Sequence, residues 1–560
     1  MSKKLVIVGG VAGGATAAAR ARRLDESAEI VLIERGREVS FANCGLPYHI
    51  GGEIPRRSAL FVQTADGLMA RFALDVRTRT EVTRIDRTTR QVHVRDLTNG
   101  REYLESYEAL LLSPGAVPVI PPLPGVDHPR VCTLRNMPDM DRIKKLVDDG
   151  ARSAIVVGGG FIGLEVAESL RHRELEVTLV ELLPQVMPNL DPEVAAPLQT
   201  ELRRHGVTLH LADAVTALAD DNGRVHATLK SGTTLTADLV VLAVGVRPES
   251  DLARTAGLEL TERGAIIVDE HMRTSDPYIY AVGDAVQVRD PVLGEPTQVP
   301  LAGPANRQAR IAVDHIFGRP ARYHGALGTS IVRVFNVTAA ATGASEKRLR
   351  ARGVPFHKVY VHRGHHAGYF PGAQMLMIKL LFTPDDGRIL GAQVVGPAGV
   401  DKRIDVLATA IHARLTVADL EDLELAYAPP YGAAKDPVNI AGYVAGNALR
   451  GDEDFVYAEE LDEARRSDWT IIDVREPAEY QAGHIPGAIL MPLGQLREGW
   501  EDIPRDKPVA LYCTLGQRAY YATRILRAKG LRPKNIAGGL LTYNLVHADH
   551  TPPTSTCRET

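Results

Sequence analysis

The sequence predicts an α/β protein of several domains, and three observations support this prediction. Segments 5–34 and 154–181 each run from an apolar strand through a glycine-rich turn and a helix to a second strand that ends in Glu. Segment 326–446 mixes strands and helices without such a turn, and a further α/β pattern begins near residue 458. The first pattern is typical of nucleotide-binding folds. We therefore expect two Rossmann-like nucleotide-binding domains, an α+β domain and a small C-terminal α/β domain.

Composition narrows the class of protein. A chain of 560 residues is long enough for three or four domains. The formal net charge of -4 gives no reason to expect nucleic acid or an anionic membrane as a partner. Four scattered cysteines are too few for a secreted disulfide framework, so we expect thiols in the cytoplasm. No stretch approaches the ~20 apolar residues of a spanning helix.

The first glycine-rich turn covers residues 9–14. It follows a strand and opens an Ala- and Arg-rich helix, which is the order that places a pyrophosphate on a helix N-terminus. Gly9 and Gly14 fit the pattern G-x-G-x-x-G, whereas Val11 stands in place of the middle glycine. Glu34 ends the next strand, where its carboxylate can accept hydrogen bonds from a ribose hydroxyl.

The second turn carries all three glycines of the pattern, Gly158, Gly160 and Gly163. Glu181 ends the strand that follows. A carboxylate there repels a 2′-phosphate and accepts from a ribose hydroxyl, so the sequence favours NADH over NADPH. Two such modules predict two dinucleotides, a resident flavin and a visiting nicotinamide.

Two strands that close on glycine turns, 110–116 with Gly115 and 239–248 with Gly245, are interpreted as crossings between the nucleotide domains. Asp284 follows another strand and precedes a helix expected near residue 304. Its side chain is placed to bond the ribityl chain of a flavin; the alternative is a helix cap or a turn residue.

Cys44 lies in the stretch 40–48, directly after the first nucleotide-binding unit. A cysteine at a helix N-terminus or tight turn is surrounded by backbone N–H groups that favour the thiolate. No second cysteine follows at C-x-x-C or C-x4-C spacing. We therefore expect Cys44 to pair with a sulfur that is brought in; the alternative is a buried, inert cysteine.

The stretch Ser-Phe-Ala-Asn-Cys-Gly-Leu-Pro-Tyr and the two glycine turns resemble the FAD-dependent pyridine nucleotide-disulfide reductase family. Its single-cysteine branch contains the coenzyme A disulfide reductases, which this stretch resembles in particular, and the NADH peroxidases and oxidases. The resemblance implies an FAD-binding domain in two parts, 1–116 and 247–325, an NAD-binding domain, 117–246, and a dimerisation domain, 326–446, that forms a homodimer.

The resemblance also implies residue roles. Tyr369 and Tyr427 match paired tyrosines whose hydroxyls assist a thiolate near Cys44; the alternative is aromatic packing. The expected cofactor contacts, beyond the residues given above, are Ala12, Gly13, Arg35, Asn43, Phe161, Ile162, Gly283, Pro300, Leu301 and Ala302.

Coenzyme A is the expected substrate or bound ligand of such a site. The positions that match the family's coenzyme A contacts are Thr16, Arg20, Arg23, Ser40, Phe41, Asn43, Arg71, Asn306 and Lys435. Three of them, Arg20, Arg71 and Asn306, differ in residue type from the family's pattern. For Arg20 and Arg23 the alternative is a solvated helix face.

A short acidic segment, 447–457, is interpreted as a linker to the last domain. Asp473-x-Arg475, the run Gly-His-Ile-Pro-Gly-Ala at 483–488 and the strand-to-helix loop at Cys513 follow in the order of a rhodanese domain, which the segment 458–550 resembles. Backbone N–H groups, a helix dipole and Arg518 would stabilise a thiolate or persulfide on Cys513. The alternative is a buried strand-end cysteine.

The two remaining cysteines have weaker signals. Cys132 has no basic residue or glycine directly beside it to activate its thiol. Cys557 lies in a Pro- and Thr-rich tail and is interpreted as incidental, with sulfur delivery as the alternative. We expect no metal site.

These features predict an NADH-dependent flavoenzyme that reduces persulfides, polysulfides and coenzyme A disulfide through a mixed disulfide at Cys44, while Cys513 handles sulfane sulfur. One alternative is an NADH peroxidase or oxidase that cycles Cys44 through sulfenic acid. The other is a non-catalytic sulfur carrier or redox sensor. The two intact glycine turns argue against the carrier.

Overall fold

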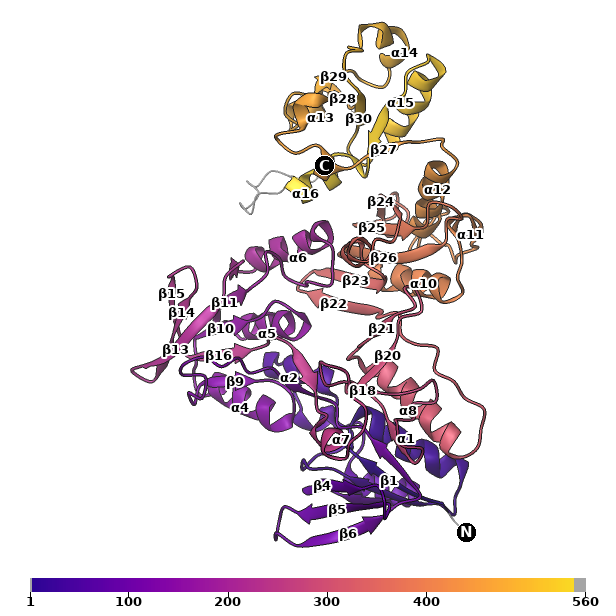
Figure 1. The fold of residues 1–560 in the computed structure, drawn as a ribbon. Coiled ribbons are helices and arrows are strands. Elements are labelled where there is room, and N and C mark those ends of the chain that lie inside the picture. The colour runs from indigo at the N-terminus through magenta and orange to yellow at the C-terminus, as the bar shows by residue number, and fades with distance from the viewer. Residues whose placement is uncertain (1–2, 548–560) are drawn as a thin grey trace. The chain divides into compact units, whose positions relative to one another are not determined.

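A computed structural model of the chain describes residues 3–547, which form two compact units (Figure 1). Unit 1 comprises residues 3–184 and 206–328, and unit 2 comprises residues 185–205 and 329–547.

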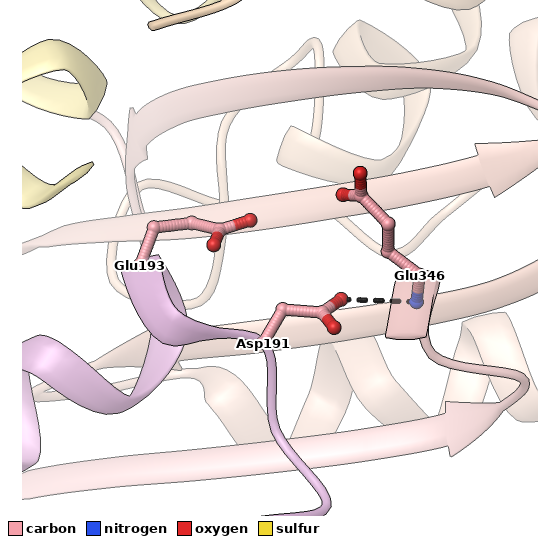
Figure 2. Close-up of side chains that lie close together, drawn as sticks. All are labelled: Asp191, Glu193 and Glu346. Atoms are coloured by element: carbon pink, nitrogen blue, oxygen red, sulfur yellow. Dashed lines mark hydrogen bonds between the residues drawn. The ribbon is translucent and has the colours of Figure 1, made fainter. Parts of the chain in front are cut away.

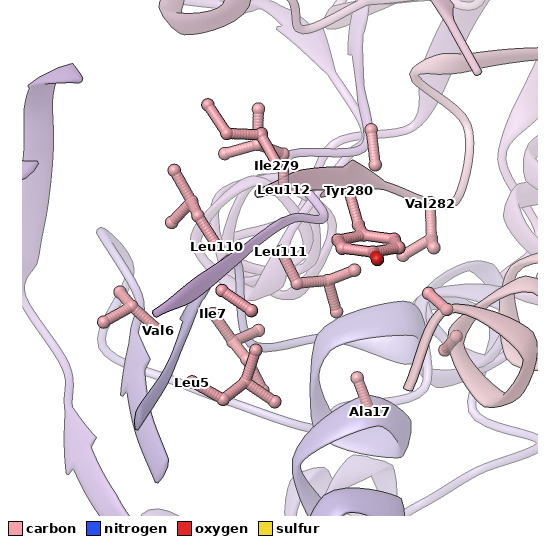
Figure 3. Packing of buried hydrophobic residues seen from close by; sticks show 14 of the residues in the cluster. Leu5, Val6, Ile7, Ala17, Leu110, Leu111, Leu112, Ile279, Tyr280 and Val282 are labelled. Atoms are coloured by element: carbon pink, nitrogen blue, oxygen red, sulfur yellow. The ribbon is translucent and has the colours of Figure 1, made fainter. Parts of the chain in front are cut away.

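A five-stranded parallel sheet begins unit 1, in the order β19-β7-β1-β2-β3. Apolar strand residues leave one continuous core, in which Leu5, Ile7 and Leu111 are fully buried (Figure 3). Helix α1 packs on α8 beside this sheet. The elements are β1 (Lys4–Val8), β2 (Glu29–Ile33), β3 (Asp75–Arg77), β7 (Ala109–Leu112), β19 (Ile279–Ala281), α1 (Ala12–Leu24) and α8 (Ala302–Ile316).

A second five-stranded parallel sheet of unit 1 has the order β12-β11-β10-β16-β9. It repeats the plan of the first sheet, with β10, α5 and β11 in the places of β1, α1 and β2. The elements are β9 (Val131–Thr133), β10 (Ser153–Val157), α5 (Phe161–His172), β11 (Glu176–Glu181), β12 (Val207–Leu211) and β16 (Leu239–Leu242).

The two segments predicted to cross between the nucleotide domains lie side by side. β8 (Ala116–Pro118) and β17 (Val246–Pro248) pair antiparallel. Two backbone bonds extend the ribbon, from Val119 N to the Gly245 carbonyl and from Glu249 N to the Gly115 carbonyl.

Shorter elements complete unit 1. They are α2 (Leu46–Gly51), α3 (Ala65–Phe72), β4 (Thr80–Asp86), β5 (Gln91–Asp96), β6 (Glu102–Ser106), α4 (Met137–Asp148), β13 (Val215–Asp221), β14 (Arg224–Leu229), β15 (Thr234–Ala237), α7 (Asp251–Thr255), β18 (Ile266–Ile267), β20 (Val286–Arg289) and β21 (Pro296–Thr297).

Unit 2 is built on an antiparallel sheet in the order β22-β23-β26-β25-β24. Its central strands are buried along nearly their whole length because helices pack on them. The elements are α6 (Pro192–Arg204), β22 (Ser330–Val334), β23 (Val337–Gly343), α9 (Glu346–Ala351), β24 (His357–Gly364), β25 (Met375–Phe382), β26 (Ile389–Gly396), α10 (Val400–His412), α11 (Val417–Asp422) and α12 (Pro437–Leu449).

A smaller parallel sheet of unit 2 has the order β27-β31-β30-β28-β29. Buried apolar clusters pack against both of its faces. The elements are β27 (Phe455–Val456), β28 (Thr470–Asp473), α13 (Pro477–Gln481), β29 (Ile489–Leu490), α14 (Leu496–Gly499), β30 (Val509–Tyr512), α15 (Gln517–Ala528), β31 (Lys534–Ile536) and α16 (Gly539–His547). With both Rossmann-like sheets, this sheet confirms the predicted fold class.

Two features bear on the predicted domain limits. Helix α6 falls in unit 2, although the sequence placed it within the second nucleotide-binding domain. The segment predicted as a linker contains β27, which pairs with β31, and Glu453, whose carboxylate accepts a 2.6 Å hydrogen bond from Asn535. The domain boundaries themselves stay predictions. None of the helices within residues 3–547 combines the length and apolar character that a membrane crossing requires.

Candidate functional site

The first glycine turn forms a cradle of backbone donors. Gly9 has a φ of +97°, and a Cβ there would collide with the carbonyl oxygen of Ser113. Val11 caps α1 without a side-chain hydrogen bond, so the N–H groups of the first helical turn are available to an anion. Glu34 accepts from Gly10 N at 2.7 Å and from Gly36 N at 2.6 Å, which fixes its carboxylate beside the turn.

The second turn has the same construction. Gly158 has a φ of +108°, and open space surrounds Gly160 where a Cβ would stand. Helix α5 also begins without a side-chain cap. Glu181 accepts from Gly159 N at 2.6 Å and from Leu183 N at 2.8 Å. These cradles and helix termini fit two dinucleotides.

Other predicted cofactor contacts lie around these turns. Helix α8 begins at Ala302 after an uncapped Leu301, so its exposed N-terminus is a further set of donors. Asp284 lies in a turn between β19 and β20 and does not cap a helix. Burial raises the pKa of its carboxyl group, against the lowering effect of Arg135. Arg35 lies 3.5 Å from Glu249.

Cys44 lies in a short 3-10 turn, Asn43–Gly45, that leads directly into α2. The preceding stretch is fixed on both sides. Ser40 has a φ of +48° and donates its N–H to the carbonyl of Gly10 at 2.8 Å. Phe41 forms a β-bridge with Phe61. The backbone just before Cys44 is therefore held against the first glycine turn, and Cys44 is exposed, contrary to the buried, inert alternative.

The electrostatics of Cys44 differ from the expectation. Partial desolvation, followed by the charges of Glu165 and Asp284, raises the pKa of its thiol. The described residues therefore disfavour the thiolate that the position near a helix start predicted. Glu165 is half-buried on α5, where desolvation raises its pKa to about 7, and it accepts a 3.3 Å hydrogen bond from Tyr48. Protonation of Glu165 near neutral pH would remove one of the charges that oppose the thiolate.

Two of the predicted coenzyme A positions are brought together. Thr16 on α1 bonds Asn306 on α8, with 2.6 Å between the oxygens. Arg20 is paired instead with Asp314, at 2.8 Å from Nε and 2.6 Å from Nη2, so its charge is largely cancelled. The other described basic positions of unit 1 in this set, Arg23 and Arg71, are exposed.

The two predicted tyrosines meet in unit 2. Their hydroxyl oxygens lie 2.7 Å apart, and Tyr369 and Tyr427 are 75% and 46% exposed. The hydrogen bond between the two hydroxyls raises the pKa of Tyr369. Rings this exposed are not packed within the chain, and the role of the hydroxyls stays a prediction. Lys435 is also exposed, just before α12.

Cys513 ends β30 and opens the loop to α15. It is 2% exposed. Gly516 precedes α15 with a φ of +92° and no side-chain cap, so the first N–H groups of that helix are free to face the loop. Asn535 Nδ2 also fixes the loop by donating a hydrogen bond to the Gly516 carbonyl at 2.9 Å. The burial of Cys513 matches the alternative of a buried strand-end cysteine, and stabilisation of a sulfur anion by this loop stays a prediction.

Helix α16 supports the same loop from another side. Leu540 N donates to the Cys513 carbonyl at 2.9 Å and Leu541 N to the Thr514 carbonyl at 3.1 Å. At the next residue, Thr542 Oγ1 lies 2.7 Å from Nε2 of His362 on β24. His362 is 5% exposed, and burial lowers its pKa to about 4. The loop that carries Cys513 is thus connected to the large sheet of unit 2 through α16.

We expect acid to weaken this support. The folded pKa of His362 lies below its ordinary value of 6.5, so its contribution is complete above pH 6.5 and is lost as the pH falls toward 4. The loss is about 2 kcal/mol between pH 7 and pH 5. Denaturant midpoints across this range measure it. Glutamine does not titrate, so the denaturant midpoint of His362→Gln should fall less steeply with pH than that of the unmodified protein. Equal pH dependence of the midpoint in the two proteins would contradict the expectation.

Unit 2 also contains a buried acidic cluster. Oxygens of Asp191, Glu193 and Glu346 lie within 4.8 Å of one another (Figure 2). The ammonium of Lys379 lies 2.9, 2.5 and 2.6 Å from these three residues. Burial opposes ionisation of Glu346, but the charges of Lys379 and Lys358 lower its pKa to about 2. Lys379 fills the position that a metal ion would take, so we assign an ion network that holds α6 on the sheet.

Sequence reasoning missed several of these residues. Glu165 follows the second glycine turn, so it was visible in the sequence but was assigned no role. A lone lysine in the apolar run of β25 was the available signal for Lys379. Cys132 is buried on β9, where desolvation raises its pKa. Cys557 lies outside the described residues.

Three family profiles match the chain. Pyridine nucleotide-disulphide oxidoreductase matches residues 3–309, its dimerisation domain matches residues 329–436, and the rhodanese-like domain matches residues 457–544. The resemblance drawn from the sequence motifs is confirmed.

Curated relatives cover about four fifths of the chain. The coenzyme A disulfide reductase of Staphylococcus haemolyticus is 36% identical over 445 residues, which are 79% of this chain and 99% of that protein. The protein of the same description from Staphylococcus aureus strain NCTC 8325 is 35% identical over 444 residues, with the same coverage.

Solved structures extend the likeness over the whole chain. Reduced CoADR-RHD of Bacillus anthracis has a TM-score of 0.95 and 49% identity, covering 98% of both chains. An NAD-dependent persulfide reductase from A. fulgidus has a TM-score of 0.90 and 38% identity, covering 96% of this chain and 99% of that one. A water-forming NADH oxidase from Lactobacillus brevis has a TM-score of 0.77 and 27% identity, covering 80% and 99%.

Proposed function

The chain belongs to the pyridine nucleotide-disulphide oxidoreductase family, and from this premise we propose that it is an NADH-dependent reductase of persulfides, polysulfides and coenzyme A disulfide. The chain is an NAD(P)H-dependent disulfide or persulfide oxidoreductase, as its relatives of both descriptions support.

FAD and a nicotinamide dinucleotide are the cofactors of this family. The turn at 9–14, Glu34 and the start of α8 would hold FAD, which when bound supplies electrons from the nicotinamide to sulfur. The turn at 158–163 would hold the nicotinamide dinucleotide. We infer a preference for NADH because Glu181 places a carboxylate, already fixed by two backbone N–H groups, where a 2′-phosphate would lie.

Cys44 acts as the nucleophile in this proposal. Its thiolate attacks one sulfur of a disulfide RSSR′, forms Cys44–S–S–R and releases R′S⁻. Two electrons then cleave the new S–S bond and return the Cys44 thiolate and RS⁻. A persulfide RSSH reacts alike when Cys44 attacks the sulfur that carries R, and the leaving group is then HS⁻. Cys44 is exposed in unit 1, whereas Cys132 is buried, so the mixed disulfide forms with the substrate.

Tyr369 and Tyr427 are proposed to donate hydrogen bonds to the departing thiolate. The hydrogen bond between their hydroxyls leaves one O–H proton of the pair for a sulfur anion. We propose that a homodimer brings this pair to Cys44 of the partner subunit. The match to the dimerisation domain supports this assembly, as does the exposure of the neighbouring aromatic residues Phe370 and Tyr431.

Coenzyme A is proposed as the carrier of the reacting sulfur. The exposed Arg23 and Arg71 suit its phosphates, whereas Arg20 contributes less because Asp314 pairs with it. The other matched positions offer neutral or cationic hydrogen-bond partners; they are Thr16, Ser40, Asn43, Asn306 and Lys435. In the last domain, Cys513 is proposed to hold sulfane sulfur as a persulfide that passes to a thiol.

The observation that carries the proposal is the exposed Cys44, fixed beside a nucleotide cradle without a second cysteine near it in the described part of unit 1. Anaerobic NADH oxidation by the holoenzyme tests it, with coenzyme A persulfide, coenzyme A disulfide, polysulfide and hydrogen peroxide compared in turn. We expect kcat/KM for the persulfide to exceed that for peroxide by about 10-fold or more. Faster turnover of peroxide would instead favour the sulfenic acid cycle of a peroxidase.

A further inference from the structure

The positively charged side chain next to Cys513, Arg518, forms an ion pair with Glu479. Arg518, in the first turn of α15, interacts with Cys513. Its guanidinium donates to both carboxylate oxygens of Glu479, at 2.7 Å from Nη1 and 2.6 Å from Nη2. A bidentate pair of this kind is among the stronger and more directional contacts of a protein. The charge that would attract an anion to Cys513 is therefore compensated at the entrance of the loop.

Glu479 is held in place by further contacts. It accepts from Thr514 Oγ1, a residue of the loop itself, at 3.2 Å. It also accepts from the backbone N–H of Glu476 at 3.1 Å, as part of the capping box of α13. The hydrogen bond from Arg518 is the largest effect on the carboxyl group and lowers its pKa to about 2, so Glu479 is ionised at any working pH.

We propose that Glu479 determines the sulfur donor of the Cys513 loop, by excluding thiosulfate and leaving the site to persulfides of thiols. In thiosulfate the sulfonate is bonded directly to the transferred sulfur, so its negative charge must enter the loop beside Glu479. In an alkyl persulfide the transferred sulfur is bonded instead to an uncharged sulfur that carries the alkyl carbon. The proposal rests on the proposed function, because it specifies the donor for the sulfur that Cys513 carries.

The transfer needs no oxidant or reductant. The Cys513 thiolate attacks the outer sulfur of RSSH, the S–S bond of the donor breaks, and RS⁻ leaves. The proton of the transferred sulfur passes to RS⁻, so the products are RSH and the Cys513 persulfide anion. With thiosulfate the same attack would release sulfite.

The test compares sulfur transfer to cyanide from thiosulfate and from glutathione persulfide, using the full-length holoenzyme. Glu479→Gln should raise kcat/KM for thiosulfate about 10-fold or more while changing that for the persulfide by less than about 3-fold. Added salt should lower the new thiosulfate activity, because an unpaired Arg518 then attracts the dianion. Glu476→Gln is the matched control: it removes the same charge three residues away, and neither donor should respond.

Glu479→Ala controls for an effect that is particular to glutamine. It should show the same increase in kcat/KM for thiosulfate. An unchanged ratio of the two activities in Glu479→Gln would overturn the inference. So would loss of both activities in both Glu479 variants, because the residue would then be structural. Absence of transfer from any persulfide in the unmodified protein would instead contradict the function proposed for Cys513.

Discussion

Replacement of Cys44 by serine is expected to abolish NADH-driven reduction, lowering kcat/KM for coenzyme A disulfide and for persulfides by about 1,000-fold or more. A serine hydroxyl remains protonated at neutral pH and forms no disulfide, so neither half of the cycle can occur. The fold should tolerate the change because Cys44 is exposed and its turn is fixed by Ser40 and Phe41. Sulfide release and NADH oxidation, measured together, report the loss.

Flavin bleaching by NADH is the control for this variant. The nucleotide cradles do not depend on the Cys44 sulfur, so Cys44→Ser should still accept electrons from NADH and fail only with the sulfur substrate. Persistent sulfide release at more than a tenth of the original rate would show that another group carries the reduction, and it would remove Cys44 from the mechanism.

Replacement of Cys513 by serine should have the opposite profile. Sulfur transfer to cyanide should fall by about 1,000-fold or more, because the sulfur that carries the persulfide is gone. NADH-driven reduction of small persulfides should stay within about 2-fold of the original rate. The loop should keep its form, since backbone bonds from Leu540 and Leu541 and the amide of Asn535 hold it.

The paired result decides the division of labour between the two cysteines. Cys513→Ser serves as the matched variant for Cys44→Ser, since each removes one sulfur from one site of the same chain. Equal losses of reduction in both variants would contradict separate roles. Such a result would indicate that the sulfur of small persulfides reaches Cys44 only after transfer through Cys513.

The local parts of this architecture could be predicted from the sequence. Strand, glycine turn and helix are neighbours in the chain, so the cradles at Gly9 and Gly158 and the strand-end carboxylates of Glu34 and Glu181 followed from order and spacing. The position of Cys44 at a helix start followed in the same way. The pairing of Tyr369 with Tyr427 was anticipated only through the family resemblance.

Contacts between remote segments could not be predicted. Arg20 and Asp314 are far apart in the chain. Their pairing compensates a positive charge that the sequence had placed in a phosphate-binding site. The raised pKa of Cys44 depends on Glu165, which arrives with the second nucleotide-binding unit. Lys379 meets its carboxylates because α6 packs on a sheet that follows much later in the sequence. Sequence pattern and residue spacing do not show which charged residues from distant segments come into contact.

The proposed cycle requires a covalent bond between Cys44 and a sulfur from the substrate. Anaerobic intact-mass and peptide-mass measurement of the holoenzyme with coenzyme A disulfide tests it directly. We predict one coenzyme A attached through a disulfide to the peptide that contains Cys44, and its loss when NADH is added. An unmodified Cys44, a sulfenic acid in place of the adduct, or an adduct that survives NADH would contradict the account.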